Sequence, residues 1–306
     1  MSEYYGSTGE GQSIRAVRRA LETGVTLLDT ADSYGCGENE RLLARALARR
    51  GERPTLATKF GVRRGDRGEF LGICGRPEYV RMACELSLRR LEVDCIDLYQ
   101  QHRVDPATPI EETVGAMVEL MRAGKVRHLG LCEVTPEEIR RAAAVAEIAT
   151  VQNEYSLFDR GVENGVLQAC EELGIGFLAY APLGRGLLTG RFRSPSDFEP
   201  GDWRRSGYFP RFDPQNLLRN VSLLREVEQV AAARGISPSQ VALAWLLSRR
   251  AWIVPIPGTT RVRHLDENVA AAGVRLSKSD LARLEGLLPK GGAASGAPYA
   301  PEHRPG

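Results

Sequence analysis

Long apolar runs and an excess of one sign of charge are both absent from this chain of 306 residues. No apolar run approaches the ~20 residues that a membrane-spanning helix needs. The amino terminus has no basic region followed by an apolar stretch, so we expect no signal peptide. Lys and Arg total 41 against 39 for Asp and Glu. This balance argues against nucleic acid or an anionic membrane as the main partner.

Cysteine and histidine are scarce and scattered. The six cysteines include no Cys-x-x-Cys pair, so we interpret them as the reduced thiols of a cytoplasmic protein rather than as a disulfide framework or a zinc site. The four histidines include no His-x-His at a strand end. This disfavours a metal-dependent barrel hydrolase, and we predict no metal site.

Short apolar runs alternate with amphipathic helical patterns along most of the chain. Helical patterns include 13–22, 39–49, 78–91, 111–122 and 136–147. Thr135-Pro136 and Ser237-Pro238 are typical helix starts, with a capping hydroxyl before a proline in the first turn. The predicted strands are Val25–Thr30, Thr55–Lys59, Ile96–Gln101, Val126–Leu131, Thr150–Asn153, Gly176–Tyr180 and Trp252–Ile256.

Near-continuous apolar strands separated by helices indicate parallel strands covered on both faces. An open doubly wound sheet and a closed barrel both fit this rhythm. The barrel is favoured because polar residues follow one strand after another, where a barrel gathers its chemistry. We therefore predict an α/β fold of the (β/α)8 TIM-barrel type, with residues 1–290 as one domain and 291–306 as a flexible tail rich in Gly, Pro and Ala.

Two irregularities interrupt this pattern. No strand is predicted between Tyr180 and Asn220, and so long a connection is typical of a lid or binding loop, or of disorder. Only seven strands are found, whereas a closed barrel of this type has eight. We expect the missing strand to be the first one, because the chain enters directly at a helix.

Four polar side chains follow three successive strands. Asp29 ends the first predicted strand, Tyr34 lies in the next loop, Lys59 ends the second strand and His102 follows the third. Each alone has an ordinary explanation, such as a helix cap, a solvated lysine, turn packing or a core histidine. Their shared position at strand ends favours a common site.

Such a set suits the reduction of a carbonyl group. A free tyrosine has a pKa of about 10, and a neighbouring ammonium lowers that pKa by favouring the phenolate. A carboxylate beside Lys59 keeps the lysine charged and positioned, and a histidine can orient the substrate carbonyl. Together the four residues could protonate the alkoxide that forms when hydride reaches a carbonyl carbon.

Several segments resemble the signatures of the aldo-keto reductase superfamily, in particular its bacterial and plant branch. The resemblance covers essentially the whole chain. The segments are Leu28-Asp29-Thr30-Ala31-Asp32-Ser33-Tyr34-Gly35, Ala57-Thr58-Lys59-Phe60-Gly61, Leu98-Tyr99-Gln100-Gln101-His102-Arg103-Val104-Asp105, Val151-Gln152-Asn153-Glu154-Tyr155-Ser156, Ala179-Tyr180-Ala181-Pro182-Leu183-Gly184-Arg185-Gly186 and Ile256-Pro257-Gly258-Thr259-Thr260.

The resemblance implies a catalytic tetrad of Asp29, Tyr34, Lys59 and His102, with Tyr34 as general acid. It also implies NADPH as the cofactor, with NADH as the alternative. Gln152 then holds the nicotinamide carboxamide and Tyr180 stacks on the nicotinamide ring. The remaining residues that the resemblance assigns to the cofactor are Cys132, Glu133, Pro182, Leu183, Gly184, Gly186, Gly258, Thr259, Thr260, Arg261, His264, Glu267 and Asn268.

The chain departs from the family pattern at three places. The family begins with a hairpin and a first barrel strand, which are expected to be missing here. A late start is favoured over a rearranged amino terminus or a partner chain that covers the gap. Cys132 stands where relatives usually carry serine, and a thiol is a weaker hydrogen-bond partner. His264 stands where relatives commonly have arginine, and Arg261 and Arg263 are near enough to compensate.

The resemblance implies an NAD(P)H-dependent oxidoreductase that acts on a small-molecule carbonyl compound. A catalytically weak, nucleotide-binding regulatory or assembly subunit of the same fold is the alternative function. Aromatic residues in the long loop, with Phe60, Tyr155 and Phe158, suggest an apolar or aromatic-tolerant substrate pocket. Self-association into a homo-oligomer is left open.

Overall fold

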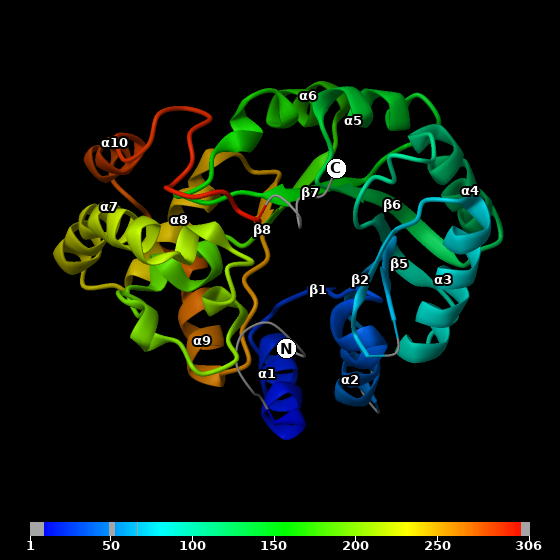
Figure 1. Ribbon diagram of the computed structural model, residues 1–306, viewed down its shortest axis with the longest axis horizontal. Helices are drawn as coiled ribbons and strands as arrows, with labels where there is room; N and C mark the ends of the chain where they lie inside the picture. The colour runs from blue at the N-terminus through cyan, green and yellow to red at the C-terminus, as the bar shows by residue number, and fades with distance from the viewer. Residues whose placement is uncertain (1–8, 49–52, 66, 301–306) are drawn as a thin grey trace.

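A computed structural model describes residues 9–48, 53–65 and 67–300. Seven strands form a curled sheet, and helices pack around its outer face (Figure 1). The strand order is β1-β2-β5-β6-β7-β8-β9, and every neighbouring pair is parallel. The seven predicted strands and the barrel-type α/β fold are therefore confirmed.

The strands of this sheet are β1 (Leu27–Asp29), β2 (Thr55–Phe60), β5 (Ile96–Gln101), β6 (Val126–Cys132), β7 (Thr150–Glu154), β8 (Gly176–Tyr180) and β9 (Ile253–Pro255). The helices are α1 (Glu10–Glu22), α2 (Glu38–Leu47), α3 (Pro77–Leu91), α4 (Ile110–Arg122), α5 (Pro136–Ala143), α6 (Val166–Leu173), α7 (Pro214–Arg234), α8 (Pro238–Arg249), α9 (Val262–Ala270) and α10 (Lys278–Glu285). Thr135 and Ser237 cap α5 and α8 through capping boxes, as their sequences predict.

The sheet does not close into a complete barrel within the described ranges. β1 pairs only with β2 and β9 only with β8, so these two strands form the edges. This agrees with the predicted count of seven strands. Among the helices of the described ranges, none combines the length and apolarity that crossing a membrane would require.

One element was not predicted, and the boundaries of helices α5 and α7 differ from those predicted. An antiparallel hairpin, β3 (Val62–Arg64) and β4 (Phe70–Ile73), follows β2. Because it contains arginines and glycines, it lacks the alternation of apolar and polar residues that predicts a strand. Helix α5 ends at Ala143 rather than Glu147, because the chain must turn there to start β7. Helix α7 begins at Pro214, before the predicted end of the long loop.

The inner face of the sheet is set by the alternation of each strand. Ala57, Leu98 and Leu178 form a small apolar cluster inside the sheet, while the larger core lies between the sheet and the helices. Successive side chains of a strand point to opposite faces, so Lys59 and Gln100, two residues beyond Ala57 and Leu98, share the inner face. Polar groups therefore line the inside at the carboxyl ends of the strands.

Residues 291–300 fall in the segment that we expected to be a flexible tail, and they are packed against the body of the protein. The backbone N–H of Ala294 donates to the carbonyl of Phe158, and that of Ala300 donates to Tyr208. Ser295 donates its N–H to the side chain of Asn220 at 2.8 Å. This segment therefore crosses the carboxyl-terminal side of the sheet. Residues 301–306 lie outside the described residues.

Candidate active site

The four predicted catalytic side chains come from the ends of three neighbouring strands. Asp29 is the last residue of β1, Lys59 lies next to the end of β2 and His102 follows β5 directly. Tyr34 begins the short 3₁₀ helix η1 (Tyr34–Gly37) just after β1. Because β1, β2 and β5 are parallel neighbours, their carboxyl ends meet at one edge and bring the four residues together.

Lys59 is the centre of this cluster. Its side chain has no exposed surface, and its Nζ lies 2.5 Å from Asp29 Oδ2. The ammonium also donates to the carbonyl of Thr30 at 2.7 Å and lies 3.5 Å from the hydroxyl of Tyr34. A buried ammonium keeps its charge only when carboxylate and hydrogen-bond partners compensate for lost hydration. Asp29 supplies that compensation here.

His102 faces Tyr34 with its ring edge-on. The ring centroids are 5.7 Å apart and the planes meet at 83°. Its Nδ1 lies 3.5 Å from Ser33 Oγ. Burial, followed by the positive charges of Arg103 and Lys59, lowers the pKa of His102 well below its ordinary value. The imidazole is therefore neutral at physiological pH and can hydrogen-bond a substrate oxygen without adding charge.

Tyr34 is held as a neutral phenol. Burial raises its pKa, and the nearby ammonium of Lys59 opposes that rise without overcoming it. The net direction differs from the lowering expected from the lysine alone, because removal of water from the phenolate is the larger effect. The proton of Tyr34 is thus retained at neutral pH.

Two glutamine side chains join the cluster through Asp29. Gln152 Nε2 donates to Asp29 Oδ1 at 2.9 Å, and Gln100 Nε2 donates to the same oxygen at 3.1 Å. The structure therefore brings Gln152, predicted to bind the cofactor carboxamide, to the predicted catalytic residues. Gln100 was missed by the sequence analysis. Its position two residues before His102, on the same face of β5, was the available signal.

Cys132 and Glu133 end the neighbouring strand β6. The thiol of Cys132 is buried and lies 3.9 Å from Gln100 Oε1. Burial raises its pKa to about 12, so it remains protonated. Glu133 has a positive φ of 53° and accepts a hydrogen bond from the backbone N–H of Glu154 at 2.9 Å. Both residues border the predicted nicotinamide region.

Tyr180, at the end of β8, contacts residues that the sequence analysis did not assign to the site. Its hydroxyl lies 3.2 Å from the hydroxyl of Tyr299. Arg185 donates to Tyr299 at 2.7 Å, and Arg103 does so at 3.4 Å. Arg103 and Arg185 both lie within the family-like motifs, so their positions were visible in the sequence. No sequence signal connected either of them with Tyr299.

The loop after β8 contains the predicted cofactor-binding residues Pro182, Leu183, Gly184 and Gly186. Pro182 is buried and Leu183 is half-buried, and they precede the 3₁₀ segment η3 (Gly184–Thr189). Gly184 and Gly186 have positive φ angles of 57° and 99°. A Cβ atom on Gly186 would lie 2.8 Å from the ring of Phe192. Glycine is therefore required at position 186, both by its backbone conformation and by its neighbour.

The segment from Gly258 to Asn268 leads into and forms the first part of α9. Gly258, Thr259 and Thr260 precede the helix, and Arg261 is its N-cap residue without a side-chain cap. Burial, then the charge of Arg191, lowers the pKa of His264, and Arg261 contributes further. Glu267 accepts a hydrogen bond from Ser237 at 2.5 Å. Positive charge thus gathers at an uncapped helix start, which is a favourable setting for an anion.

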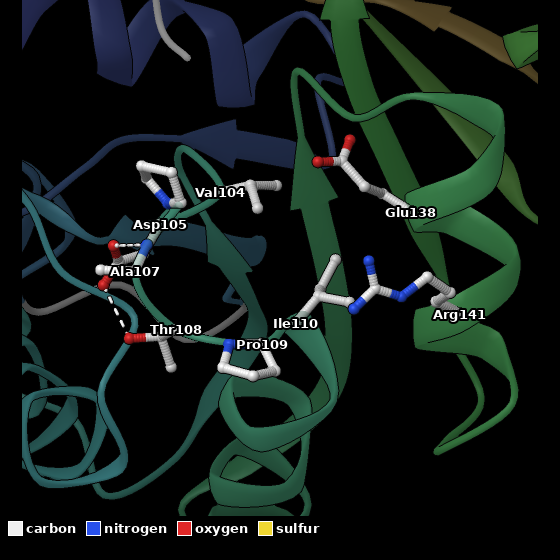
Figure 2. A pocket seen from close by; sticks show the side chains of 9 residues that line it. Val104, Asp105, Ala107, Thr108, Pro109, Ile110, Glu138 and Arg141 are labelled. Atoms are coloured by element: carbon white, nitrogen blue, oxygen red, sulfur yellow. Dashed lines mark hydrogen bonds between the residues drawn. The ribbon is translucent and has the colours of Figure 1, made fainter.

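Two surface hollows lie apart from these residues. One of about 410 Å³ lies between the loop 104–109 and helix α5; Figure 2 shows Arg141 of that helix reaching toward Pro109 and Ile110. Its Asp105 bonds within the loop to Ala107 and Thr108. A second, of about 460 Å³, lies at the amino-terminal side of β6 and β8. Neither hollow includes a predicted catalytic residue, and no metal-binding group of His, Cys, Asp or Glu occurs in the described part of the chain.

Comparison with known sequences identifies proteins similar to this chain. A family model described as the aldo/keto reductase family matches residues 2–289. The chain is 44% identical over 278 residues to the aldo-keto reductase yakc [NADP(+)] of Schizosaccharomyces pombe, covering 89% of this chain and 81% of that protein. It is 42% identical over 292 residues to probable aldo-keto reductase 1 of Glycine max, covering 95% and 83%.

Solved structures with the same fold agree with these sequences. A glycerol dehydrogenase, AKR11B4 from Gluconobacter oxydans, superposes with a TM-score of 0.85 at 31% identity, covering 94% of this chain and 88% of that one. An aldo/keto reductase from Klebsiella pneumoniae, solved in complex with NADP and acetate, gives a TM-score of 0.73 at 27% identity, covering 98% and 93%.

Proposed function

The chain belongs to the aldo/keto reductase family and is an oxidoreductase, and from this premise we propose that it uses NADPH to reduce an aldehyde or ketone to an alcohol. Tyr34 supplies the proton. The observation that carries the proposal is the contact chain from Asp29 through Lys59 to Tyr34, with the neutral His102 edge-on beside it. Tyr34 keeps its proton, Lys59 is charged and His102 is neutral, as the reaction requires.

The proton step follows from these contacts. Tyr34 holds its proton at neutral pH and can donate it to an alkoxide oxygen within hydrogen-bond distance. The resulting phenolate lies beside the ammonium of Lys59, which stabilises it at the moment it forms. Asp29 keeps Lys59 charged, and His102 can hydrogen-bond the substrate oxygen without repelling the ammonium.

The residues around the tetrad fit NADPH. When bound, the cofactor supplies the hydride. Gln152 and Cys132 border the tetrad, and Tyr180 offers an aromatic ring at the end of β8, the strand that pairs with the strand of Gln152. A nicotinamide and its carboxamide require such partners. In the segment from Gly258 to Asn268, burial lowers the pKa of His264, and like-charge repulsion from Arg191 and Arg261 lowers it further. A bound phosphate would relieve this repulsion. That need for negative charge favours NADPH over NADH.

The long connection between β8 and α7 fits a carbonyl pocket that tolerates apolar groups. Its aromatic rings pack against one another, with Tyr208 contacting Trp203, Phe209 and Tyr299 edge-on. We also propose a cytoplasmic location, which all six cysteines support because each is a free thiol.

Replacement of Tyr34 by phenylalanine tests the function. NADPH binding is measured by fluorescence titration, and turnover is measured with 4-nitrobenzaldehyde. Tyr34→Phe is expected to lower kcat by about 10²–10⁴-fold, the usual contribution of a positioned general acid. The dissociation constant for NADPH should stay within about two-fold, since the variant keeps the ring and removes one hydroxyl to which no cofactor contact is assigned.

Tyr79→Phe is the matched control, because Tyr79 lies on α3 outside the tetrad, and it should leave both quantities unchanged. Full activity in Tyr34→Phe would refute the assignment of the acid. Tight NADPH binding by the wild-type protein without turnover of any aldehyde would favour a regulatory subunit instead.

A further inference from the structure

Arg103 is a half-buried guanidinium beside the catalytic histidine whose donors are mostly unused. One Nη donates to the carbonyl of His102 at 2.8 Å, and the other reaches the hydroxyl of Tyr299 at 3.4 Å. A guanidinium has five N–H donors. No ion pair joins Arg103 to a carboxylate among residues 9–48, 53–65 and 67–300. A guanidinium in this position has capacity for a further acceptor.

Two guanidinium donors and a second hydroxyl converge on the hydroxyl oxygen of Tyr299. Arg185, in the loop after β8, donates to the hydroxyl of Tyr299 at 2.7 Å, which is the length of a charge-assisted hydrogen bond. Arg103 approaches the same oxygen from the end of β5, and the hydroxyl of Tyr180 lies 3.2 Å away at the end of β8. A phenol oxygen thus occupies a position flanked by two cations, and a carboxylate oxygen would interact with those cations more strongly.

Within the described ranges, the nearby carboxylates of Glu154 and Glu133 form no ion pair with Arg103. Glu154 accepts from Arg185 with one oxygen at 2.8 Å and from Arg211 with the other at 2.9 Å. Glu133 acts favourably on the charge of Arg103, but its Oε1 accepts the backbone N–H of Glu154. The protein therefore leaves the positive charge of Arg103 without a direct counter-ion.

We propose that Arg103 and Arg185, together with the hydroxyl of Tyr180, form a subsite for a carboxylate on the carbonyl substrate, and that the Tyr299 hydroxyl occupies this subsite until such a substrate displaces it. Arg103 is a specificity-determining residue in this proposal. Its guanidinium donates to the carbonyl of His102, and its charge acts on the imidazole, so it lies close to the catalytic histidine. A substrate whose carbonyl oxygen meets Tyr34 and His102 can therefore present a carboxylate to Arg103. The substrates selected are aldehydes or ketones that also bear a carboxylate.

The proposal rests on the proposed reductase function, and the test separates the two. The kcat/KM values of the three carboxybenzaldehyde isomers are compared with those of their methyl esters, which share size and ring but lack the charge. At least one acid should exceed its ester in the wild-type protein. Arg103→Gln should lower that acid-to-ester ratio by about ten-fold or more, while the ester itself changes little. Arg103→Lys, which keeps the charge and loses the fork, should retain part of the preference.

Two further variants sharpen the result. Tyr299→Phe removes the competing oxygen and keeps the ring, so KM should fall for the preferred acid and stay the same for its ester. Arg127→Gln is the matched control, since Arg127 is at the amino-terminal end of β6 with a side chain 65% exposed. It should leave the ratio unchanged.

A ratio of one or less for all three isomers in the wild-type protein would overturn the proposal. An unchanged ratio in Arg103→Gln would overturn it too and leave Arg103 a packing role. If no aldehyde is reduced at all, the proposed reductase function is refuted. The subsite is then tested separately by calorimetry, which measures ligand binding to the cofactor-free protein. Tighter binding of benzoate than of benzamide, lost in Arg103→Gln and kept in Tyr34→Phe, would support it; equal binding would refute it.

Discussion

Replacing Asp29 by asparagine leaves the ammonium of Lys59 buried without its carboxylate. The side chain of Lys59 is fully buried and that of Asp29 is 12% exposed, so solvent screens their interaction very little. Asparagine has nearly the same shape and still offers an oxygen to Gln100 and Gln152. The substitution therefore removes the negative charge with little change in packing.

The magnitude follows from the burial of the pair. Removing one partner of a buried ion pair costs about 3–5 kcal/mol, because the other charge stays in a poorly solvated place. Replacing both partners by neutral groups of similar volume is far less costly. We therefore expect Asp29→Asn to lower the free energy of unfolding by about 3–5 kcal/mol at pH 7. The double variant Asp29→Asn/Lys59→Met should recover at least about half of that loss.

The pH dependence has a definite sign. Burial alone lowers the pKa of Lys59, but Asp29 outweighs this and the pKa lies above its ordinary value. Stabilisation from a raised lysine pKa is present in full below the unfolded pKa, so it persists in the wild-type protein up to about pH 10. In Asp29→Asn the carboxylate no longer offsets burial, so the pKa of Lys59 in the folded protein falls below its pKa in the unfolded chain. The loss of stability should then shrink as the pH rises from 6 to 10.

Urea unfolding followed by tryptophan fluorescence measures these changes at several pH values. Glu111→Gln is the matched control, because its partner Arg141 and Glu111 itself are both largely exposed. It should change stability far less than Asp29→Asn. A double variant as unstable as the sum of its two single variants would refute the coupling. So would an Asp29→Asn deficit that grows with pH.

Two further outcomes are expected from single substitutions. Burial and the charge of Glu40 raise the pKa of Asp32 to about 8, and its Oδ1 is buried without a partner. Since the unfolded carboxyl ionises near pH 4, the stability attributable to Asp32 falls as the pH rises from about 4 to 8. The melting temperature of Asp32→Asn should therefore exceed that of the wild-type protein by a margin that widens up to pH 8. A margin that stays constant with pH would contradict this. Gly186→Ala puts a methyl group 2.8 Å from Phe192 at a φ of 99°. Thermal unfolding should show that the free energy of unfolding falls by about 1–3 kcal/mol, and titration should show weaker NADPH binding. Gly235→Ala is also at positive φ but has open space around it, so it should leave NADPH binding unchanged.

The strands were predictable because each has a short apolar run bounded by turn residues. Strand β2 is an example. Leu56, Thr58 and Phe60 face the helices while Ala57 and Lys59 face inward. The hairpin β3–β4 was not predictable, because it buries little and its residues alternate without an apolar face. Backbone pairing and polar contacts such as that of Arg64 with the carbonyl of Gly68 hold it in place, and these leave no hydrophobic pattern in the sequence.

The predicted tetrad is assembled by strand order, which the sequence does encode. The contacts of Gln152 and Tyr299 depend on side-chain orientation and on how a distant segment returns to the sheet. Gln152 turns its amide to Asp29, 123 residues away in the chain. Tyr299 reaches Arg185 across 114 residues, although the composition of its segment predicted flexibility. Side-chain contacts between residues so far apart in the chain are decided by packing, and a local residue pattern does not predict them.

The pKa of Tyr34 shows the same limit on a smaller scale. The sequence placed a lysine near the tyrosine, and from that charge alone the pKa should fall. The direction is reversed by burial, a property of the whole site that no single neighbour reveals. The reversal also suits the chemistry. A buried phenol that keeps its proton, beside an ammonium fixed in its charged state by Asp29, holds both the proton to be donated and the charge that stabilises its loss. In the proposed reaction Lys59 therefore acts mainly on the phenolate that forms when Tyr34 gives up its proton, and its effect on the resting tyrosine is secondary.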